Sequence, residues 1–468
     1  MTLPGRRNRP APAKGRVLFI GTSYYNNWYL SRELRKRGWK ADLLVCSAEG
    51  AKHYLHGCDA YLEEYLLWDG KYGKHISDFL EPLLKEASRS EPSPMRHRTT
   101  GPTWKAALAA VIRNLLKGHA GKTCLRALLP LYLRSVRPKQ PRELAILKEI
   151  WRRYDILHFT GVNSLRYFYF FNPYLFGAMP IGWDIRLLKR LGMKIVYTNI
   201  GCLDGVSQSS FRVWKPEPVC DICRWRDEPA VCSDEKNLAW GKLRNELADY
   251  QCTLGGNRAD YNEDPHVHEV PEFYCLDPEV WYPELEIPEE HRLNLPKETV
   301  KIYHAVGNYD LRTHSEGTNI KCTHIYLPLI DRLKREGLAV DAIFCKDIPG
   351  MEVRFHQAQA DIVVDMLTFG WFGANIREGM MLGKPCVCFL RPEWLQSMRK
   401  EIPAYVDELP VISATPDTVE YVLRDLIRNP DKRKEIGQRS RAFALKWHSS
   451  AAGAKRFMEI YSALLRKV

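Results

Sequence analysis

Short apolar runs alternate with amphipathic segments along two long parts of the chain. In the first part, apolar runs predict strands at 16–20, 41–46, 154–161 and 193–199. In the second part, they predict strands at 300–306, 339–345, 361–365, 386–390 and 409–412. Segments with helical periodicity separate most of these strands, and a repeated order of strand, helix and strand calls for a parallel sheet. The pattern therefore predicts an α/β fold with two Rossmann-like parallel-sheet domains.

A Pro- and acid-rich segment near 276–298 is the best candidate for a linker between the two predicted domains. We therefore expect an N-terminal domain over 1–285 and a C-terminal domain over 298–445, followed by a terminal helix at 446–468. With 468 residues, the chain is long enough for two or three domains that each bury a core.

The stretch 365–390 reads as a tight turn, a helix and a buried strand. Gly373 permits a tight backbone just before the helix, and Gly383 is placed to end it. Helix N-termini attract phosphate, and Glu378, one turn into the helix, can accept hydrogen bonds from ribose hydroxyls. The stretch suits a nucleotide site. An ordinary turn, helix and strand with a surface glutamate has the same pattern.

Polar residues follow several predicted strands, at the edge where open parallel sheets bind ligands. His158 lies near the end of one strand, and a Gly-rich turn at 201–205 follows the next. Arg312 and Lys321 lie in the loop after the strand at 300–306, where their charges can neutralise a diphosphate in the same cleft as Glu378. The alternatives are a structural histidine and a solvated basic loop.

The composition is that of a globular protein, with 45% hydrophobic and 27% charged residues. The sequence contains no run of about 18 apolar residues, so we expect no transmembrane helix. The basic N-terminus lacks the apolar core of a signal peptide. The 13 cysteines are scattered and odd in number, which favours free thiols in a reducing compartment. We therefore expect a cytoplasmic protein.

A cysteine-rich segment at 202–232 follows one of these strand ends. One close pair with two outlying thiols can supply the four tetrahedral ligands of a structural zinc ion that holds a loop beside the cleft. The alternatives are four buried free thiols or an iron–sulfur cluster. The candidate ligands are Cys202, Cys220, Cys223 and Cys232.

Most of the net charge of +13 lies in one segment that interrupts the alternation, near 88–142. Between Arg89 and Arg142 there are 12 Lys or Arg and one acid, Glu91, a net charge of +11. Two stretches of this insertion read as basic amphipathic helices, which suit an anionic membrane surface. The alternative is a helical hairpin packed on the domain with a solvated basic rim. No RNA-binding or helix-turn-helix motif accompanies the charge, so nucleic acid is not an expected partner.

Several motifs together resemble one enzyme family. The segment FGANIREGMMLGKP at 372–385 looks like a glutamate-containing donor motif, and Lys321-Cys322-Thr323 stands where that family often has Lys-Gly-Thr. Further similar segments are Ala360 to Asp365, Tyr154 to His158, Ile195 to Asp204, Trp447 to Ser449 and Ile460-Tyr461. With the two α/β halves, they resemble the two-Rossmann (GT-B) glycosyltransferases, closest to the retaining group 1, family-four-like branch of bacteria.

The resemblance implies a nucleotide sugar in a central cleft between the domains, with a terminal helix packing back towards the first domain. It also implies retention of configuration without a catalytic divalent metal, and the chain has no Asp-x-Asp triplet. The implied catalytic residues are His158, Arg312, Lys321 and Glu378. The expected nucleotide-binding residues are Gly21, Asn308, Arg312, Lys321, Gly373, Asn375, Ile376 and Glu378.

Two positions depart from the family pattern. The usual motif has two glutamates separated by seven residues, and the first of them, which contacts the sugar, falls at Gly370 here. Sugar recognition therefore cannot be carried over from that position. Cys322 replaces the glycine that usually follows the lysine, so the family pattern gives weaker support to a contact between Lys321 and a phosphate.

The resemblance implies a glycosyltransferase that moves a sugar from a UDP- or GDP-sugar to a glycan or lipid-linked acceptor in bacterial surface polysaccharide synthesis. The basic insertion would hold it against the cytoplasmic face of the inner membrane. Two alternatives remain: a nucleotide-sugar epimerase or phosphorylase on the same fold, and a non-catalytic scaffold with a degenerate cleft.

Overall fold

The structure is a computed structural model of the whole chain. It describes residues 14–21, 25–45, 60–61, 150–161, 183–199, 201–202, 204–212, 219–229, 231–253 and 258–466. The predicted basic insertion at 88–142 lies outside these residues. Among the helices that are described, none is long and apolar enough to cross a membrane.

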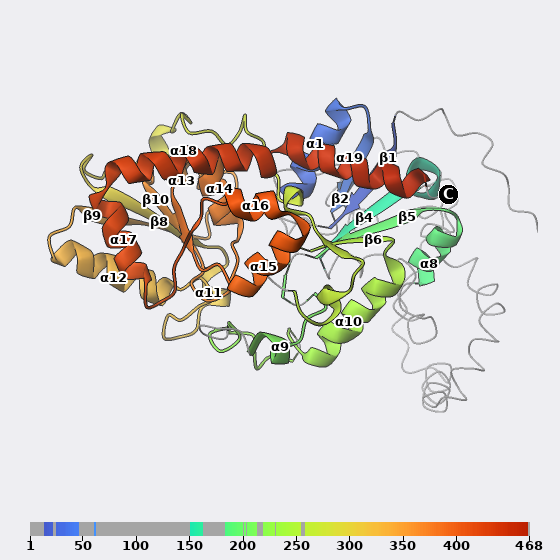
Figure 1. Cartoon of the computed structure of the whole chain (residues 1–468), viewed down its shortest axis with the longest axis horizontal. Helices are drawn as coiled ribbons and strands as arrows, with labels where there is room; N and C mark the ends of the chain where they lie inside the picture. The colour runs from blue at the N-terminus through green and yellow to red at the C-terminus, as the bar shows by residue number, and fades with distance from the viewer. Residues whose placement is uncertain are drawn as a thin grey trace, which may run out of the picture.

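The described residues form two parallel sheets, one in each half of the chain (Figure 1). The first sheet has seven strands in the order β3-β2-β1-β4-β5-β6-β7, and all neighbouring strands pair in parallel. In chain order, they are β1 (Arg16–Ile20), β2 (Lys40–Val45), β3 (Ala60–Tyr61), β4 (Ile156–Thr160), β5 (Lys194–Thr198), β6 (Tyr250–Thr253) and β7 (Val267–Glu269). Both β1 and β4 are buried along their whole length, as expected for strands covered on both faces.

The second sheet has five parallel strands in the order β12-β11-β10-β8-β9. Its strands are β8 (Val300–Val306), β9 (Val340–Lys346), β10 (Ile362–Val364), β11 (Cys386–Cys388) and β12 (Ile412–Ser413). The two-sheet α/β architecture predicted from the apolar runs is confirmed. The strands β3 and β7 were not predicted, and neither were α11, α15 and α16 among the helices described next.

Helices follow most strands. Those of the first half are α1 (Asn26–Lys36), α8 (Trp183–Arg190), α9 (Gln208–Arg212) and α10 (Asp234–Leu247). The second half has α11 (Tyr309–Arg312), α12 (Thr323–Arg335), α13 (Val353–Ala358), α14 (Ala374–Met381), α15 (Pro392–Glu401), α16 (Pro403–Glu408) and α17 (Val419–Arg428), followed by α18 (Pro430–Trp447) and α19 (Ser450–Arg466). Three short 3₁₀ turns are η2 (Asp260–Glu263), η3 (Pro271–Phe273) and η4 (Glu289–His291).

The last two helices connect the halves. In Figure 1, α18 runs along the second sheet and α19 continues over the first, where it packs against α1. Between them, the backbone N–H of Leu276 donates to the His448 carbonyl at 2.8 Å, and the Ser450 N–H donates to the Leu276 carbonyl at 2.7 Å. The end of the chain is thereby joined to the segment that leaves the first sheet.

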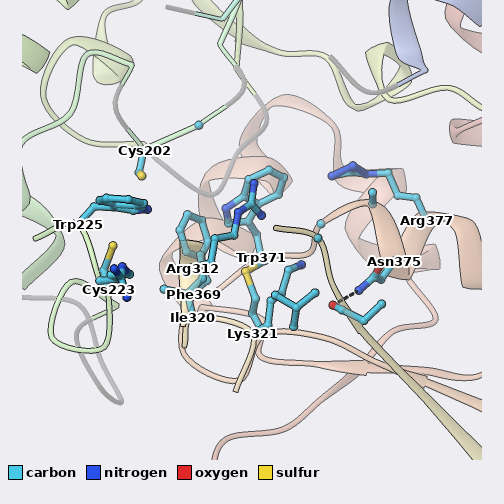
Figure 2. Close-up of a pocket in the computed structure, with 18 of the residues that line it drawn as sticks. Cys202, Cys223, Trp225, Arg312, Ile320, Lys321, Phe369, Trp371, Asn375 and Arg377 are labelled. Carbon is cyan, nitrogen blue, oxygen red and sulfur yellow. Dashed lines mark hydrogen bonds between the residues drawn. The ribbon is translucent and has the colours of Figure 1, made fainter. Parts of the chain in front are cut away.

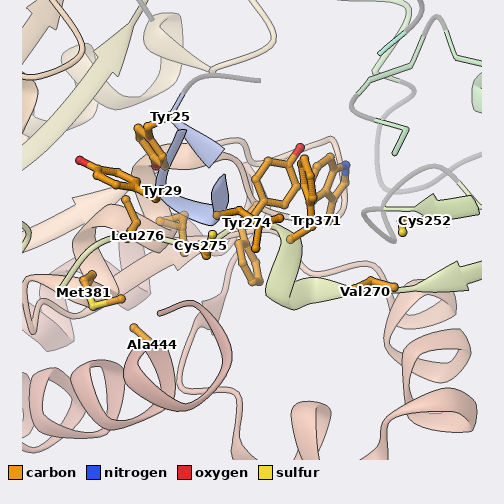
Figure 3. Packing of buried hydrophobic residues seen from close by; sticks show 14 of the residues in the cluster. Tyr25, Tyr29, Cys252, Val270, Tyr274, Cys275, Leu276, Trp371, Met381 and Ala444 are labelled. Atoms are coloured by element: carbon orange, nitrogen blue, oxygen red, sulfur yellow. The ribbon is translucent and has the colours of Figure 1, made fainter. Parts of the chain in front are cut away.

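One hydrophobic cluster passes through both halves (Figure 3). It joins Tyr25 and Tyr29, at the start of α1, to Leu276 and to Met381 of the second half. These side chains are buried, so the two halves share one hydrophobic core. That core lies next to the site described below, because Tyr25 belongs to both.

Candidate functional site

A cavity of about 450 Å³ lies between the two halves, at the carboxyl end of the second sheet (Figure 2). The second half lines it with Val306 and Gly307, at the end of β8, and with Met366, just after β10. The first half contributes Tyr25 and part of the segment 201–237. Strands β8 and β10 are adjacent at the point where the strand order reverses, which is where open α/β sheets bind ligands.

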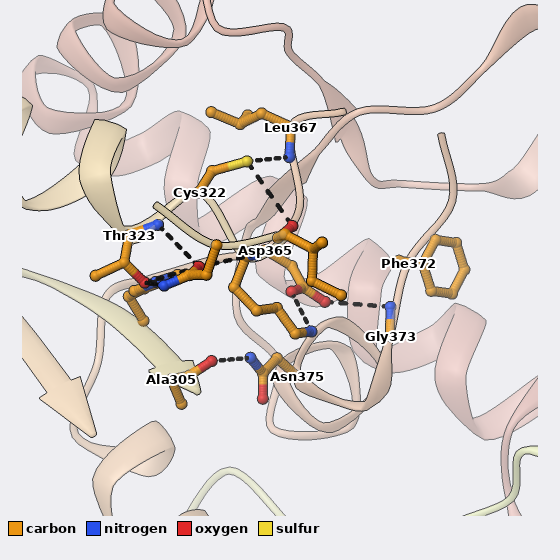
Figure 4. A network of polar contacts seen from close by, with 12 residues as sticks. Ala305, Cys322, Thr323, Asp365, Leu367, Phe372, Gly373 and Asn375 are labelled. Atoms are coloured by element: carbon orange, nitrogen blue, oxygen red, sulfur yellow. Dashed lines mark hydrogen bonds and ion pairs between the residues drawn. The ribbon is translucent and has the colours of Figure 1, made fainter. Parts of the chain in front are cut away.

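A buried carboxylate holds two of the residues that line this cavity (Figure 4). Asp365 follows β10 and is completely buried. Its Oδ1 atom pairs with the Lys321 ammonium at 2.6 Å, and its Oδ2 atom accepts the Gly373 backbone N–H at 3.1 Å. Asp365 therefore fixes both the lysine and the turn that opens α14. In the sequence, this acid stood only at the end of the family-like segment Ala360 to Asp365.

Cys322 explains how a residue other than glycine fits after Lys321. Its backbone lies in the left-handed region, with φ of 60° and ψ of 34°, where glycine is favoured. The side chain is buried, and the Leu367 backbone N–H donates to its sulfur at 3.4 Å. A buried contact thus compensates for the strained backbone, and the turn that presents Lys321 is formed without glycine.

Glu378, on α14, lines the cavity and is buried, with 5% of its surface exposed. Its Oε1 atom accepts a hydrogen bond from the Tyr25 hydroxyl at 2.7 Å, and its Oε2 atom accepts one from the Gln357 amide at 2.7 Å. Burial raises the pKa of the Glu378 carboxyl, and the two hydrogen bonds oppose that rise. Both oxygens of the carboxylate that we predicted to bind ribose therefore have a donor from within the protein.

Arg377, next to Glu378, forms part of the cavity wall. Its guanidinium lies 3.5 Å from the centre of the Tyr274 ring and donates to the Phe372 carbonyl at 2.8 Å. The described lining residues carry five cationic side chains, from Arg224, Arg226, Arg312, Lys321 and Arg377, and two acidic ones, from Asp347 and Glu378. This excess of positive charge suits an anionic ligand.

The structure brings most of the predicted site residues together. Those that line the cavity are Arg312, Lys321, Gly373, Asn375, Glu378 and the four cysteines of the segment 202–232. Asn375 donates from its amide to the Ala305 carbonyl at 3.2 Å, which ties the start of α14 to β8. Gly21, Asn308 and Ile376 do not line the cavity. Gly21 ends β1 with φ of 100°, Asn308 precedes α11 in the left-handed region, and Ile376 is buried in the core.

His158 lies in the core of the first half and does not line the cavity. Its Nδ1 atom is 2.6 Å from the Tyr461 hydroxyl of α19, and its Nε2 atom is 2.7 Å from the Thr198 hydroxyl. Burial lowers the pKa of His158 to about 3, so the ring is neutral at pH 7. This placement joins α19 to the first sheet and gives no support to the predicted role at the reacting centre.

Gly370 cannot be replaced by a carboxylate without moving its neighbours. Its φ is 90°, and a Cβ atom built on it would stand 2.6 Å from the Cβ atom of Arg391. The Arg391 backbone N–H also donates to the Gly370 carbonyl at 2.8 Å. The missing glutamate therefore reflects a turn built around glycine and packed on Arg391.

The four thiols of the segment 202–232 share one wall of the cavity. Burial and the other three thiols raise the pKa of Cys202, and the amides of Gln208 and Asn237 approach the Cys232 sulfur at 3.4 and 3.6 Å. Within the described residues, however, no group of three or more His, Cys, Asp or Glu side chains is placed to hold a metal ion. The predicted zinc ion, and the iron–sulfur alternative, find no support in this arrangement.

The reactivity of Cys220 tests the state of these thiols. Burial and the neighbouring Cys223 and Cys232 raise its pKa to about 12, so the thiolate fraction should rise about tenfold per pH unit from pH 7 to pH 10. We expect the rate of alkylation of Cys220, followed by peptide mass spectrometry, to rise in parallel without levelling off. A plateau near pH 9 would contradict the raised pKa. Protection at every pH that is relieved by a chelator would instead reveal a bound metal.

Many solved structures resemble the chain, and two of them match it over nearly its whole length with a TM-score of 0.50. Sucrose-phosphate synthase from Thermosynechococcus elongatus is 14% identical, with a TM-score of 0.50 over 97% of this chain and 100% of its own. Anabaena Alr3699/HepE in complex with UDP-glucose is 12% identical, with a TM-score of 0.50 over 96% of this chain and 100% of its own. This chain has the GT-B fold. The predicted fold family is therefore confirmed.

The likeness is one of GT-B architecture, because the sequences have diverged to 14% identity or less. No protein-family model matches the sequence, and no curated protein matches it. The chemistry of this GT-B protein therefore rests on the residues of its own cavity. The complex with UDP-glucose is a property of the Anabaena protein and is not carried over to this chain.

Sequence reasoning missed several residues of the GT-B cavity. Tyr25 reaches Glu378 from the other half of the chain, and Tyr274 supports Arg377 from a segment just before the predicted linker. Such contacts between distant segments leave no local pattern. A signal was available for Arg377 alone, since it adjoins Glu378 at the start of a helix expected to face phosphate.

Proposed function

We propose that this protein is a glycosyltransferase that uses a nucleoside diphosphate sugar as donor. The observation that carries the proposal is the cavity at the switch point of the second sheet, which is lined by five cationic side chains and by a buried, hydrogen-bonded glutamate. A nucleoside diphosphate matches both features, because its phosphates need cations and its ribose offers two hydroxyls to a carboxylate. The GT-B fold supports this assignment.

The charges of the cavity account for leaving-group stabilisation. Breaking the bond between sugar and phosphate leaves negative charge on the phosphate oxygens. Lys321 is held in place by Asp365, and Arg312 lines the same cavity, so their positive charges require little rearrangement as that charge develops. Side-chain cations can therefore do the work that a divalent metal does in other transferases. We include metal-independent transfer, with retention of configuration, in the proposal.

The acceptor is proposed to be a glycan or a lipid-linked glycan of a bacterial surface polysaccharide. The support is the charge of the sequence at 89–142, a net +11, which suits an enzyme working beside an anionic cytoplasmic membrane surface. Binding of the whole protein to vesicles of anionic lipid, compared with a variant in which Arg113, Lys117, Arg126 and Arg134 are glutamate, tests this part.

Replacing Glu378 by glutamine tests the donor site. The amide keeps the shape of the side chain but removes the charge that accepts ribose hydroxyls. We expect the Kd for UDP or GDP, measured by calorimetry, to rise about 10- to 100-fold. Glu269→Gln is a matched control, since Glu269 is buried but pairs with Arg258 and does not line the cavity.

The same measurements separate the alternative functions. If the folded wild-type protein binds neither UDP, GDP nor ADP, the proposed donor site is wrong and a scaffold role gains support. If a nucleotide binds, product analysis with a panel of nucleotide sugars decides the reaction. Transfer that requires an acceptor supports a glycosyltransferase. Conversion of the sugar without an acceptor identifies an epimerase, and release of sugar phosphate from a glycan identifies a phosphorylase.

A further inference from the structure

Tyr25, from the first half of the chain, contacts the Glu378 carboxylate in the proposed nucleotide-sugar site. It lies just before α1, is 4% exposed and lines the cavity beside Glu378. Its ring packs against Tyr29 and Trp281, with ring centres 5.6 and 5.7 Å away. These contacts hold the hydroxyl against the carboxylate, where it donates to Oε1 at 2.7 Å.

The phenol at this position is a chemical match for a ribose hydroxyl. Both are neutral O–H groups that donate to a carboxylate oxygen, and burial together with the negative charge of Glu378 raises the pKa of Tyr25, so the hydroxyl keeps its proton. The second oxygen of Glu378 accepts from Gln357 at 2.7 Å, and Gln357, unlike Tyr25, does not line the cavity. Each carboxylate oxygen can accept a second hydrogen bond, but only 5% of Glu378 is exposed, so we expect a ligand with two hydroxyls to compete with the Tyr25 hydroxyl for this buried group.

We propose that the Tyr25 hydroxyl occupies the ribose-binding position on Glu378 in the empty protein and must leave it when a nucleotide binds. Tyr25 is then an affinity-determining residue of the donor site, contributed by the opposite half of the chain. This inference rests on the proposed function, because it assigns Glu378 to the ribose. It adds that nucleotide binding breaks a buried contact between the two halves.

The competition predicts that removing the Tyr25 hydroxyl improves nucleotide binding. In Tyr25→Phe, Oε1 of Glu378 has lost its internal donor and is left for the ligand. We expect the variant to bind UDP, or GDP where UDP does not bind, about tenfold more tightly than the wild type by calorimetry. With the matching 2′,3′-dideoxynucleoside diphosphate, which lacks both ribose hydroxyls, we expect no gain.

Tyr29→Phe is the matched control. It removes a buried hydroxyl from the first turn of α1, next to Tyr25, but that hydroxyl accepts a hydrogen bond from the Trp281 indole at 3.2 Å. We expect its nucleotide affinity to equal that of the wild type. Circular dichroism and thermal melting confirm that each variant is folded before binding is compared.

The outcomes distinguish this inference from the proposed function. Equal or weaker nucleotide binding by Tyr25→Phe, with a wild type that binds normally, overturns the competition and leaves the donor site intact. A gain that persists with the dideoxynucleotide also overturns it, because the ribose would then not be the competing group. If neither the wild type nor Tyr29→Phe binds a nucleotide, the donor site itself is wrong, and this inference fails with it.

Discussion

Replacing Lys321 by alanine is expected to lower the free energy of unfolding by about 3–5 kcal/mol, a range typical of breaking a buried ion pair. The Asp365 carboxylate is completely buried, and the lysine lies 2.6 Å from it with 14% of its own side chain exposed. Without the ammonium group, Asp365 keeps one backbone N–H donor, from Gly373, at 3.1 Å. The loss should appear as a lower denaturation midpoint in urea.

A second substitution separates stability from chemistry. In the double variant Lys321→Ala, Asp365→Asn, no buried charge is left unpaired, so we expect most of the lost stability to return. Transferase activity should stay low in both variants, because the cation proposed to stabilise the departing phosphate is absent. Full activity in the folded double variant would remove Lys321 from the mechanism. A destabilisation below about 1 kcal/mol in the single variant would show that the pair is solvated.

Replacing Gly370 by glutamate is expected to destabilise the protein without restoring the two glutamates that are usual in the family motif. The left-handed backbone, with φ of 90°, and the close approach of Arg391 both oppose any side chain there. Overpacking and backbone strain each cost about 1–3 kcal/mol, so we expect a loss of about 3 kcal/mol or more in thermal or urea unfolding.

Two alanine variants divide that loss into its causes. Gly317 has nearly the same backbone, with φ of 88°, but a Cβ atom there would meet nothing within 4 Å. Gly317→Ala therefore measures the backbone strain alone, and Gly370→Ala adds the contact with Arg391. We expect Gly370→Ala to be clearly the more destabilising of the two. Equal effects would mean that the chain around Arg391 yields easily, and an acid at this position would then be tolerated.

Local patterns in the sequence predicted the regular elements well because periodicity, glycine and proline act over a few residues. The predicted helix after Gly373 appears as α14, and the strand predicted at 300–306 appears as β8. The same reasoning placed Lys321 and Glu378 on one cavity, since the ends of parallel strands share an edge.

Contacts between the halves could not be predicted in this way. His158 lies in the predicted strand, in the middle of β4, and α19, about 300 residues later in the chain, covers it with Tyr461. The Tyr25 hydroxyl meets Glu378 across a similar separation. A pattern of neighbours in sequence gives no information on which distant helix will cover a given strand. The burial of His158 and the contact between Tyr25 and Glu378 therefore became visible only in the folded structure.

The closing helix also bears on how the chain is made. The ring of His158 packs against Phe457 and Tyr461, residues that leave the ribosome only after the whole second sheet has been synthesised. During translation, part of the core of the first sheet therefore stays uncovered until α19 has been made. The first half cannot complete its core as soon as it emerges, as domains often do. We expect nascent chains that end before α19 to need chaperone protection, and the final helical turns to be the step that makes the first half resistant to proteases.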